Sequence, residues 1–140
     1  MVEAAGDFDR KEWEIARTAR RFECGSPNMI GIHALNASLS LLLETGMEQV
    51  EDEVAKRSEY LFDRIRNESG LELVTSTQAG RYAGIVTFRR KGIDNKALYN
   101  YLISQNVVCA SRAGGIRLSP HFYTPYEHLD KVIEMARKYK

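Results

Sequence analysis

Two segments of the sequence combine residue types that could bind an anion. The first, Arg21-Phe-Glu-Cys-Gly-Ser-Pro-Asn28, places Gly25, the hydroxyl of Ser26 and free backbone N–H groups at the expected start of a helix, which suits a phosphate. The second, Gly114-Gly-Ile-Arg-Leu-Ser-Pro-His-Phe-Tyr-Thr124, holds Arg117 between apolar residues of a short strand, which suits a carboxylate bound by two parallel hydrogen bonds. Each segment also has a purely structural interpretation, as a capped helix start and as an edge strand that leads into another cap.

Other catalytic constellations are missing from the sequence. The histidines at positions 33, 121 and 128 share no zinc-ligand spacing with Cys24 and Cys109, so we expect no metal site. The dinucleotide-binding, phosphate-loop and Gly-x-Ser-x-Gly patterns do not occur. We interpret His121 as a structural loop residue. Cys109 follows two valines, and we interpret it as a small buried hydrophobe that does not act as a reactive thiolate.

Composition limits the class of protein. The chain has 140 residues, of which 44% are hydrophobic and 28% charged, as expected for one globular domain. A net charge of +1 gives no support for a nucleic-acid partner. The longest apolar stretch, 39–43, is far shorter than the roughly 18 residues that would span a membrane. With two cysteines and no signal peptide, the sequence predicts a soluble protein of the reducing cytoplasm, with no membrane partner.

Four helices are expected from the spacing of apolar residues and from capping signals. Ser26 as N-cap, Pro27 at the first helical position and Gly46 as the stop delimit the first helix. Its apolar positions are Ile30, Ala34, Leu35, Leu39 and Leu42. A second helix is predicted over 48–67 with an apolar stripe of Val50, Val54, Leu61 and Ile65. A third begins after Asp94 and ends near 106. The last begins at the capping box Thr124-Pro-Tyr-Glu127.

Short strands are expected between these helices, at 71–75, 82–89, 107–110 and 116–119. Alternation in the second strand places Tyr82, Gly84, Val86 and Phe88 on one face. Strands joined by short connections favour antiparallel pairing, and the helices should then lie on one face of the sheet. The sequence therefore predicts an α+β fold, a two-layer sandwich with a small, mostly antiparallel sheet.

The two motifs together resemble the C-terminal part of class V aminotransferase-fold enzymes. This group includes cysteine desulfurases, selenocysteine lyases, isopenicillin N epimerase-like proteins and kynureninases. Its pattern is Arg-Phe-Glu-x-Gly-Thr-Pro-Asn, two helices, a strand pair, an Arg-x-Ser-x-x-x-Tyr-Asn-Thr segment and a final helix. The resemblance runs from Trp13 to the C-terminus. It implies that residues 1–20 lead in from a large domain and that 21–140 form the small domain of a fold-type I enzyme.

The resemblance also implies roles for particular residues. Arg117 matches the arginine that holds the α-carboxylate of an amino acid substrate. Ser26 matches the hydroxyl residue that reaches the phosphate of pyridoxal 5′-phosphate in the neighbouring subunit, and Gly25 and Asn28 shape that turn. Arg21 matches a motif arginine near the same interface of a homodimer.

Other features depart from the family pattern. The lysine that binds the cofactor covalently lies upstream of the Arg-Phe-Glu motif in this family, and none of the lysines here matches it: Lys11, Lys56, Lys91, Lys96, Lys131, Lys138 and Lys140. We therefore expect a C-terminal part of a longer enzyme that does not catalyse alone.

The type of reaction stays open. A cysteine desulfurase or selenocysteine lyase-like parent is the leading hypothesis. Cys109 stands only eight residues before Arg117, which is closer to kynureninase-like and epimerase-like relatives, and Tyr123-Thr-Pro125 replaces Tyr-Asn-Thr. A non-catalytic α+β interaction module is the remaining alternative.

Overall fold

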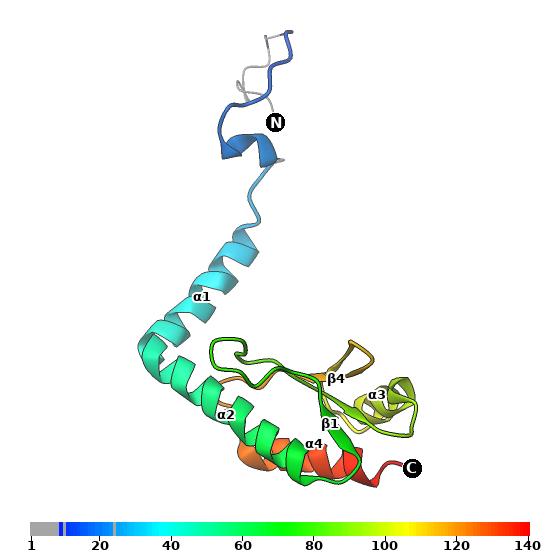
Figure 1. Ribbon diagram of the computed structural model, residues 1–140. Helices are drawn as coiled ribbons and strands as arrows, with labels where there is room; N and C mark the ends of the chain where they lie inside the picture. The colour runs from blue at the N-terminus through cyan, green and yellow to red at the C-terminus, as the bar shows by residue number, and fades with distance from the viewer. Residues whose placement is uncertain (1–8, 10, 24) are drawn as a thin grey trace. The chain divides into compact units, whose positions relative to one another are not determined.

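The computed structural model describes residues 9, 11–23 and 25–140, which fall into two compact units divided between Glu44 and Thr45. Figure 1 shows the elements in chain order. They are η1 (Ala19–Phe22), α1 (Met29–Thr45), α2 (Met47–Asn67), β1 (Leu71–Leu73), β2 (Val86–Arg90), α3 (Asn95–Ser104), β3 (Ala110–Arg112), β4 (Gly115–Leu118) and α4 (Tyr126–Lys138).

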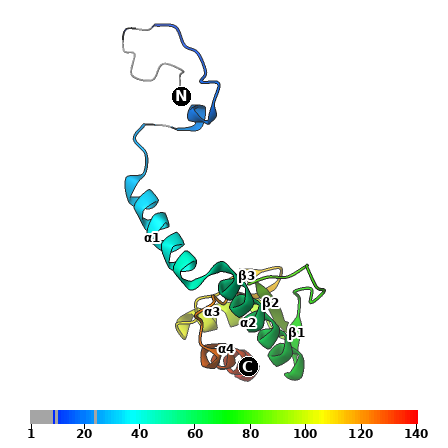
Figure 2. The same ribbon diagram turned by 90° about the vertical axis from the view of Figure 1, so that its left-hand side faces the viewer.

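The second unit is a four-stranded sheet with helices packed on it. The strand order is β1-β2-β4-β3 and every neighbouring pair is antiparallel. Helices α2 and α3 pack against the sheet, α4 packs against both of these helices, and two views show α2 and α4 side by side (Figures 1 and 2). This arrangement confirms the predicted α+β two-layer fold.

The core of this unit lies between the sheet and the helices. Phe88 and Ile116 from the sheet, Leu61 from α2, Leu98 from α3 and Ile133 from α4 are all fully buried. Alternation along β2 and β4 supplies the sheet side of this core, as predicted for Val86 and Phe88. The predicted strand at 82–89 is shorter in the structure, because β2 begins at Val86 and leaves Tyr82 and Gly84 in the preceding loop.

Helix α1 differs from the other long helices because none of its residues is buried. The exposed apolar side chains of this helix are Met29, Ile30, Ile32, Leu35, Leu39, Leu41 and Leu43. The helix predicted from the spacing of apolar residues is therefore present, but its apolar side chains are not part of a core within the described residues. A helix that is apolar on most sides normally packs against other parts of a protein.

The structure corrects two of the expected helix caps. Asn28, not Ser26, caps α1, because its side-chain Oδ1 accepts from the Gly31 N–H at 3.0 Å. At the start of α4, Thr124 Oγ1 accepts from the His121 N–H at 2.9 Å and makes no capping bond, so the capping box does not form. Asp94 caps α3 as predicted, by accepting from the Lys96 N–H.

Candidate active-site residues

Arg117 lies in the middle of β4 on the face of the sheet that is turned away from the helices. Its strand neighbours Ile116 and Leu118 are buried in the core, so alternation places Arg117 on the opposite face. There it pairs with Thr87 of β2 and Ala110 of β3, two residues with smaller side chains, and its own side chain is half-buried. The packing of Ile116 and Leu118 on one side of β4 thus fixes the backbone from which the charged Arg117 side chain extends.

The charged end of Arg117 has no partner in the part of the chain that the structure describes. Its Nε is buried and makes no hydrogen bond, and no carboxylate forms an ion pair with it there. A buried charged donor left unpaired costs roughly 1–3 kcal/mol or more. The geometry therefore fits an external carboxylate bound at this arginine.

The hairpin between β3 and β4 sets the position of Arg117. Arg112 pairs with Gly115, so only Ala113 and Gly114 form the turn, with φ values of 51° and 69°. Positive φ at both positions is the type I′ geometry, which a glycine adopts freely and an alanine only with strain. The strands expected at 107–110 and 116–119 are therefore corrected. Both lie closer to the turn, as β3 at Ala110–Arg112 and β4 at Gly115–Leu118.

The loop that follows β4 is held by an arginine of α2. Arg57 is buried, and its Nε donates to the Thr124 carbonyl at 2.7 Å. Its Nη1 donates to Glu53, and this bond is the main reason that the pKa of Glu53 is lowered. Arg57 is not among the candidate residues that the sequence predicted. Its position between Val54 and Leu61 on the apolar stripe of α2 could have indicated that this arginine is buried.

Residues of the first motif lie in the first unit. Gly25 has a φ of 80° and precedes the exposed Ser26, while the Arg21 guanidinium lies over the Phe22 ring at 5.0 Å. The first turn of α1 holds no acidic residue, so nothing in that turn neutralises the positive end of the helix dipole. A Cβ at Gly31 would lie 2.6 Å from the Asn28 amide, so a glycine there leaves room for the cap. This helix start fits a phosphate.

Cys109 is half-buried just before β3, and burial raises the pKa of its thiol. A raised pKa leaves less thiolate at neutral pH. We expect iodoacetamide to alkylate Cys109 more slowly in the folded chain than in the urea-unfolded chain at pH 8, and the midpoint of the rate-versus-pH curve to lie higher when folded. A Cys24→Ser variant followed by mass spectrometry isolates this thiol, and equal midpoints would contradict the expectation.

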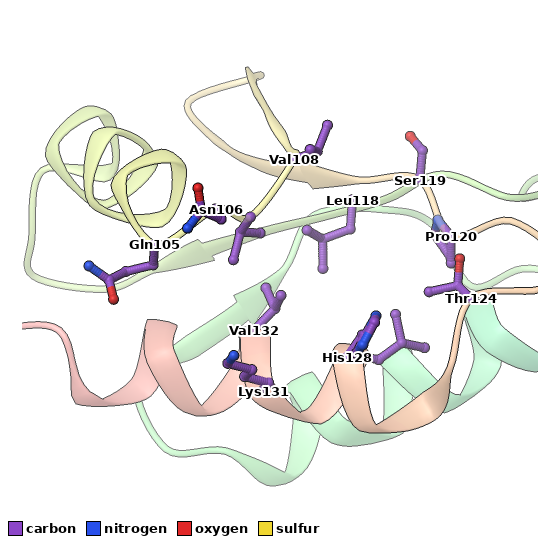
Figure 3. A pocket seen from close by; sticks show the side chains of 12 residues that line it. Gln105, Asn106, Val108, Leu118, Ser119, Pro120, Thr124, His128, Lys131 and Val132 are labelled. Atoms are coloured by element: carbon purple, nitrogen blue, oxygen red, sulfur yellow. The ribbon is translucent and has the colours of Figure 1, made fainter.

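A cavity of about 480 Å³ opens between the end of α3, the end of β4 and the first turns of α4. Leu118 from the sheet and His128 and Val132 from α4 point into it, with Lys131 at its edge (Figure 3). Arg117 does not line this cavity, because Leu118 faces the helices and Arg117 faces the other way. The cavity and the carboxylate-binding candidate therefore belong to different faces of the sheet.

Neither a metal centre nor a membrane span is found in the described ranges. No three histidine, cysteine, aspartate or glutamate side chains gather there in a way that could hold a metal ion. Among the helices of those ranges, none combines the length and the apolar character that a bilayer crossing requires.

The sequence matches a family model and two curated proteins. Residues 3–132 match the model of the aminotransferase class-V family. An uncharacterized aminotransferase of Bacillus subtilis, YcbU, is 35% identical over 128 residues, which are 88% of this chain and 32% of that protein. A probable cysteine desulfurase of Ureaplasma parvum is 23% identical over 146 residues, covering 95% of this chain and 36% of that protein.

The fold is shared with a solved enzyme structure. The cystine C–S lyase C-DES, in complex with its product cysteine persulfide, has a TM-score of 0.78 at 22% identity, covering 99% of this chain and 36% of that chain. A mutant of the same lyase carries glycine covalently linked to its pyridoxal phosphate cofactor. This chain spans about a third of the length of the proteins that it matches. With the family model matched over most of its residues, the chain belongs to the aminotransferase class-V family.

Proposed function

We propose that this chain is the C-terminal domain of a pyridoxal-phosphate enzyme that acts on an amino acid, and that Arg117 binds the substrate's α-carboxylate. The observation that carries the proposal is the unpaired, buried Nε of Arg117 on the open face of the sheet. The family membership supports an enzyme as the parent protein.

The role of Arg117 follows from its rigidity. Two buried neighbours hold its backbone, and a planar guanidinium can form two parallel hydrogen bonds to one carboxylate. Such a bond pair fixes the rotation of the substrate as well as its position. Arg117 would thereby orient the bond at the α-carbon that has to break.

The start of α1 would hold the cofactor's phosphate. Ser26 offers an exposed hydroxyl beside a helix N-terminus, and Asn28 keeps that terminus ordered through its bond to Gly31. When bound, pyridoxal phosphate supplies the electron sink that lets a bond to the α-carbon break. In a homodimer this phosphate would belong to the neighbouring subunit, with Arg21 near the interface.

The apolar surface of α1 supports a longer parent protein. Exposed side chains such as Ile30, Leu35 and Leu43 would cost free energy if water covered them permanently. We propose that the large domain or a second subunit covers them. A reducing cytoplasm would suit the free thiol of Cys109.

One observation favours a reaction other than desulfuration. The two-residue turn between β3 and β4 leaves no long loop that could carry a persulfide toward the substrate, and the pKa of Cys109 is raised. An epimerase-like or kynureninase-like parent is therefore the second candidate beside the desulfurase or selenocysteine lyase-like one. A domain without catalysis is the third.

Expression of the full-length gene product tests these candidates. Bound pyridoxal phosphate should give the visible absorbance band of a cofactor attached to a lysine, and the band should change when the right amino acid is added. Sulfide release from cysteine would indicate a desulfurase-like parent, and we expect it to survive the Cys109→Ser change. Racemisation would indicate an epimerase-like parent, and side-chain cleavage a kynureninase-like one. A full-length protein that binds no cofactor would leave only the non-catalytic module.

The 140-residue chain by itself should neither bind pyridoxal phosphate covalently nor turn over amino acids, because none of its lysines matches the family's attachment site. Borohydride reduction at stoichiometric cofactor, followed by mass spectrometry, checks this, with the full-length protein as the positive control. A single modified lysine at full occupancy in the short chain would refute the expectation.

A further inference from the structure

Three arginines share the open face of the sheet. Arg117 on β4 lies in one cross-strand row with Thr87 and Ala110. In the next row, Gly115 on β4 pairs with Arg112 on β3, and the β2–β4 register places Arg89 on its other side. Because side chains two residues apart on a strand point the same way, Arg89 and Arg112 lie on the same face as Arg117.

Gly115 makes room for the Arg89 side chain. A Cβ at Gly115 would lie 3.0 Å from Arg89 Cγ and would clash with the Phe88 carbonyl, while one at Gly114 would lie 4.0 Å from Arg89 Nε. The aliphatic part of Arg89 therefore crosses β4 over Gly115, and its Nε lies beside the β3–β4 turn. A residue with a side chain at Gly115 would displace the arginine.

The charge of Arg89 is not compensated within the described residues. Its Nε is buried and, like that of Arg117, makes no hydrogen bond there. Glu72 of β1 pairs with Arg89 across the strands, but its carboxylate is exposed and forms no ion pair with the arginine. Within the described part of the chain, Arg112 donates to the Ser111 carbonyl and to no carboxylate. This face thus carries a surplus of positive charge, beyond what one α-carboxylate at Arg117 would neutralise.

The strand positions of these arginines indicate the kind of molecule that fits. Arg89 is the diagonal neighbour of Arg117, and diagonal positions on adjacent antiparallel strands are roughly 7–8 Å apart, within reach of long side chains. We propose that Arg89 binds a second carboxylate, in the side chain of the substrate, so that the enzyme prefers acidic amino acids. This inference rests on the proposed function, because it takes Arg117 as the site of the α-carboxylate.

A comparison of acidic substrates with their amides tests the inference in the full-length holoenzyme. We expect kcat/KM for L-aspartate or L-glutamate to exceed that for asparagine or glutamine by at least about tenfold, the effect of losing one charged hydrogen bond. Arg89→Gln should abolish most of this preference by lowering the value for the acid and leaving that for the amide. Arg137→Gln is the matched control, because it removes the same charge from the exposed face of α4. It should change kcat/KM neither for the acid nor for the amide.

Binding of non-reacting acids gives a readout that does not depend on turnover. By titration calorimetry, succinate should bind the holoenzyme at least about tenfold more tightly than its half-amide succinamate, and Arg89→Gln should make the two equal. Equal wild-type affinities for the two, or an Arg89→Gln variant that still prefers the acid, would overturn the inference. If Arg117→Gln leaves succinamate binding unchanged, the proposed role of Arg117 fails instead.

Discussion

Replacing Arg117 with alanine should lower kcat/KM of the full-length enzyme by at least about ten- to a hundredfold, since a charged hydrogen bond contributes about 1.5–3 kcal/mol and 1.36 kcal/mol is tenfold. The loss has two sources. The substrate loses a charged partner for its carboxylate, and it gains freedom to rotate away from the reactive orientation. Steady-state kinetics with the preferred amino acid measures the effect.

Lysine at the same position should recover little activity, because an ammonium group cannot reproduce the planar pair of donors. Thermal melts of both variants are the control. A side chain on the open face contributes little to the core, so stability should change much less than activity. Near-normal kinetics with a lowered melting temperature would instead show that Arg117 stabilises the strand and does not bind substrate.

Phe88→Ala should reduce the free energy of unfolding of the second unit by about 3–5 kcal/mol, the usual cost of removing a buried phenylalanine. Phe88 is fully buried and pairs with Leu73 on one side and Ile116 on the other, so the cavity would open at the centre of the sheet. Urea unfolding of the 140-residue chain, followed by circular dichroism, gives the value.

A matched control is the same substitution at an exposed phenylalanine. Phe22 is 76% exposed, so Phe22→Ala should change the free energy of unfolding by no more than about 0.5 kcal/mol. If Phe88→Ala cost as little as this control, the assignment of Phe88 to the centre of the core would be wrong.

Features that depend on short-range periodicity could be predicted from the amino-acid order. Alternation along 82–89 placed Val86 and Phe88 on one face together with Tyr82 and Gly84, and Val86 and Phe88 are buried in β2. Helical spacing predicted α2 to within one residue at its start, and Asp94 marked the beginning of α3. These features are local, because a strand repeats every two residues and a helix about every 3.6. The motifs around Ser26 and Arg117 likewise indicated the family from residue types and order alone.

The contacts across strands and between elements, by contrast, depend on how the whole chain packs. The β3–β4 turn tightened to Ala113 and Gly114 because Arg112 pairs with Gly115, a register that no single strand encodes. The same register brings Arg89 over Gly115, although Arg89 precedes a separate helix in the sequence.

Capping and loop anchoring were decided in the same way. Thr124 could cap α4 by its sequence, yet its hydroxyl bonds to His121 while Arg57 of α2 holds its carbonyl. A side chain with several possible partners takes the one that the packed chain brings within hydrogen-bond distance, and that distance depends on residues far away in the sequence.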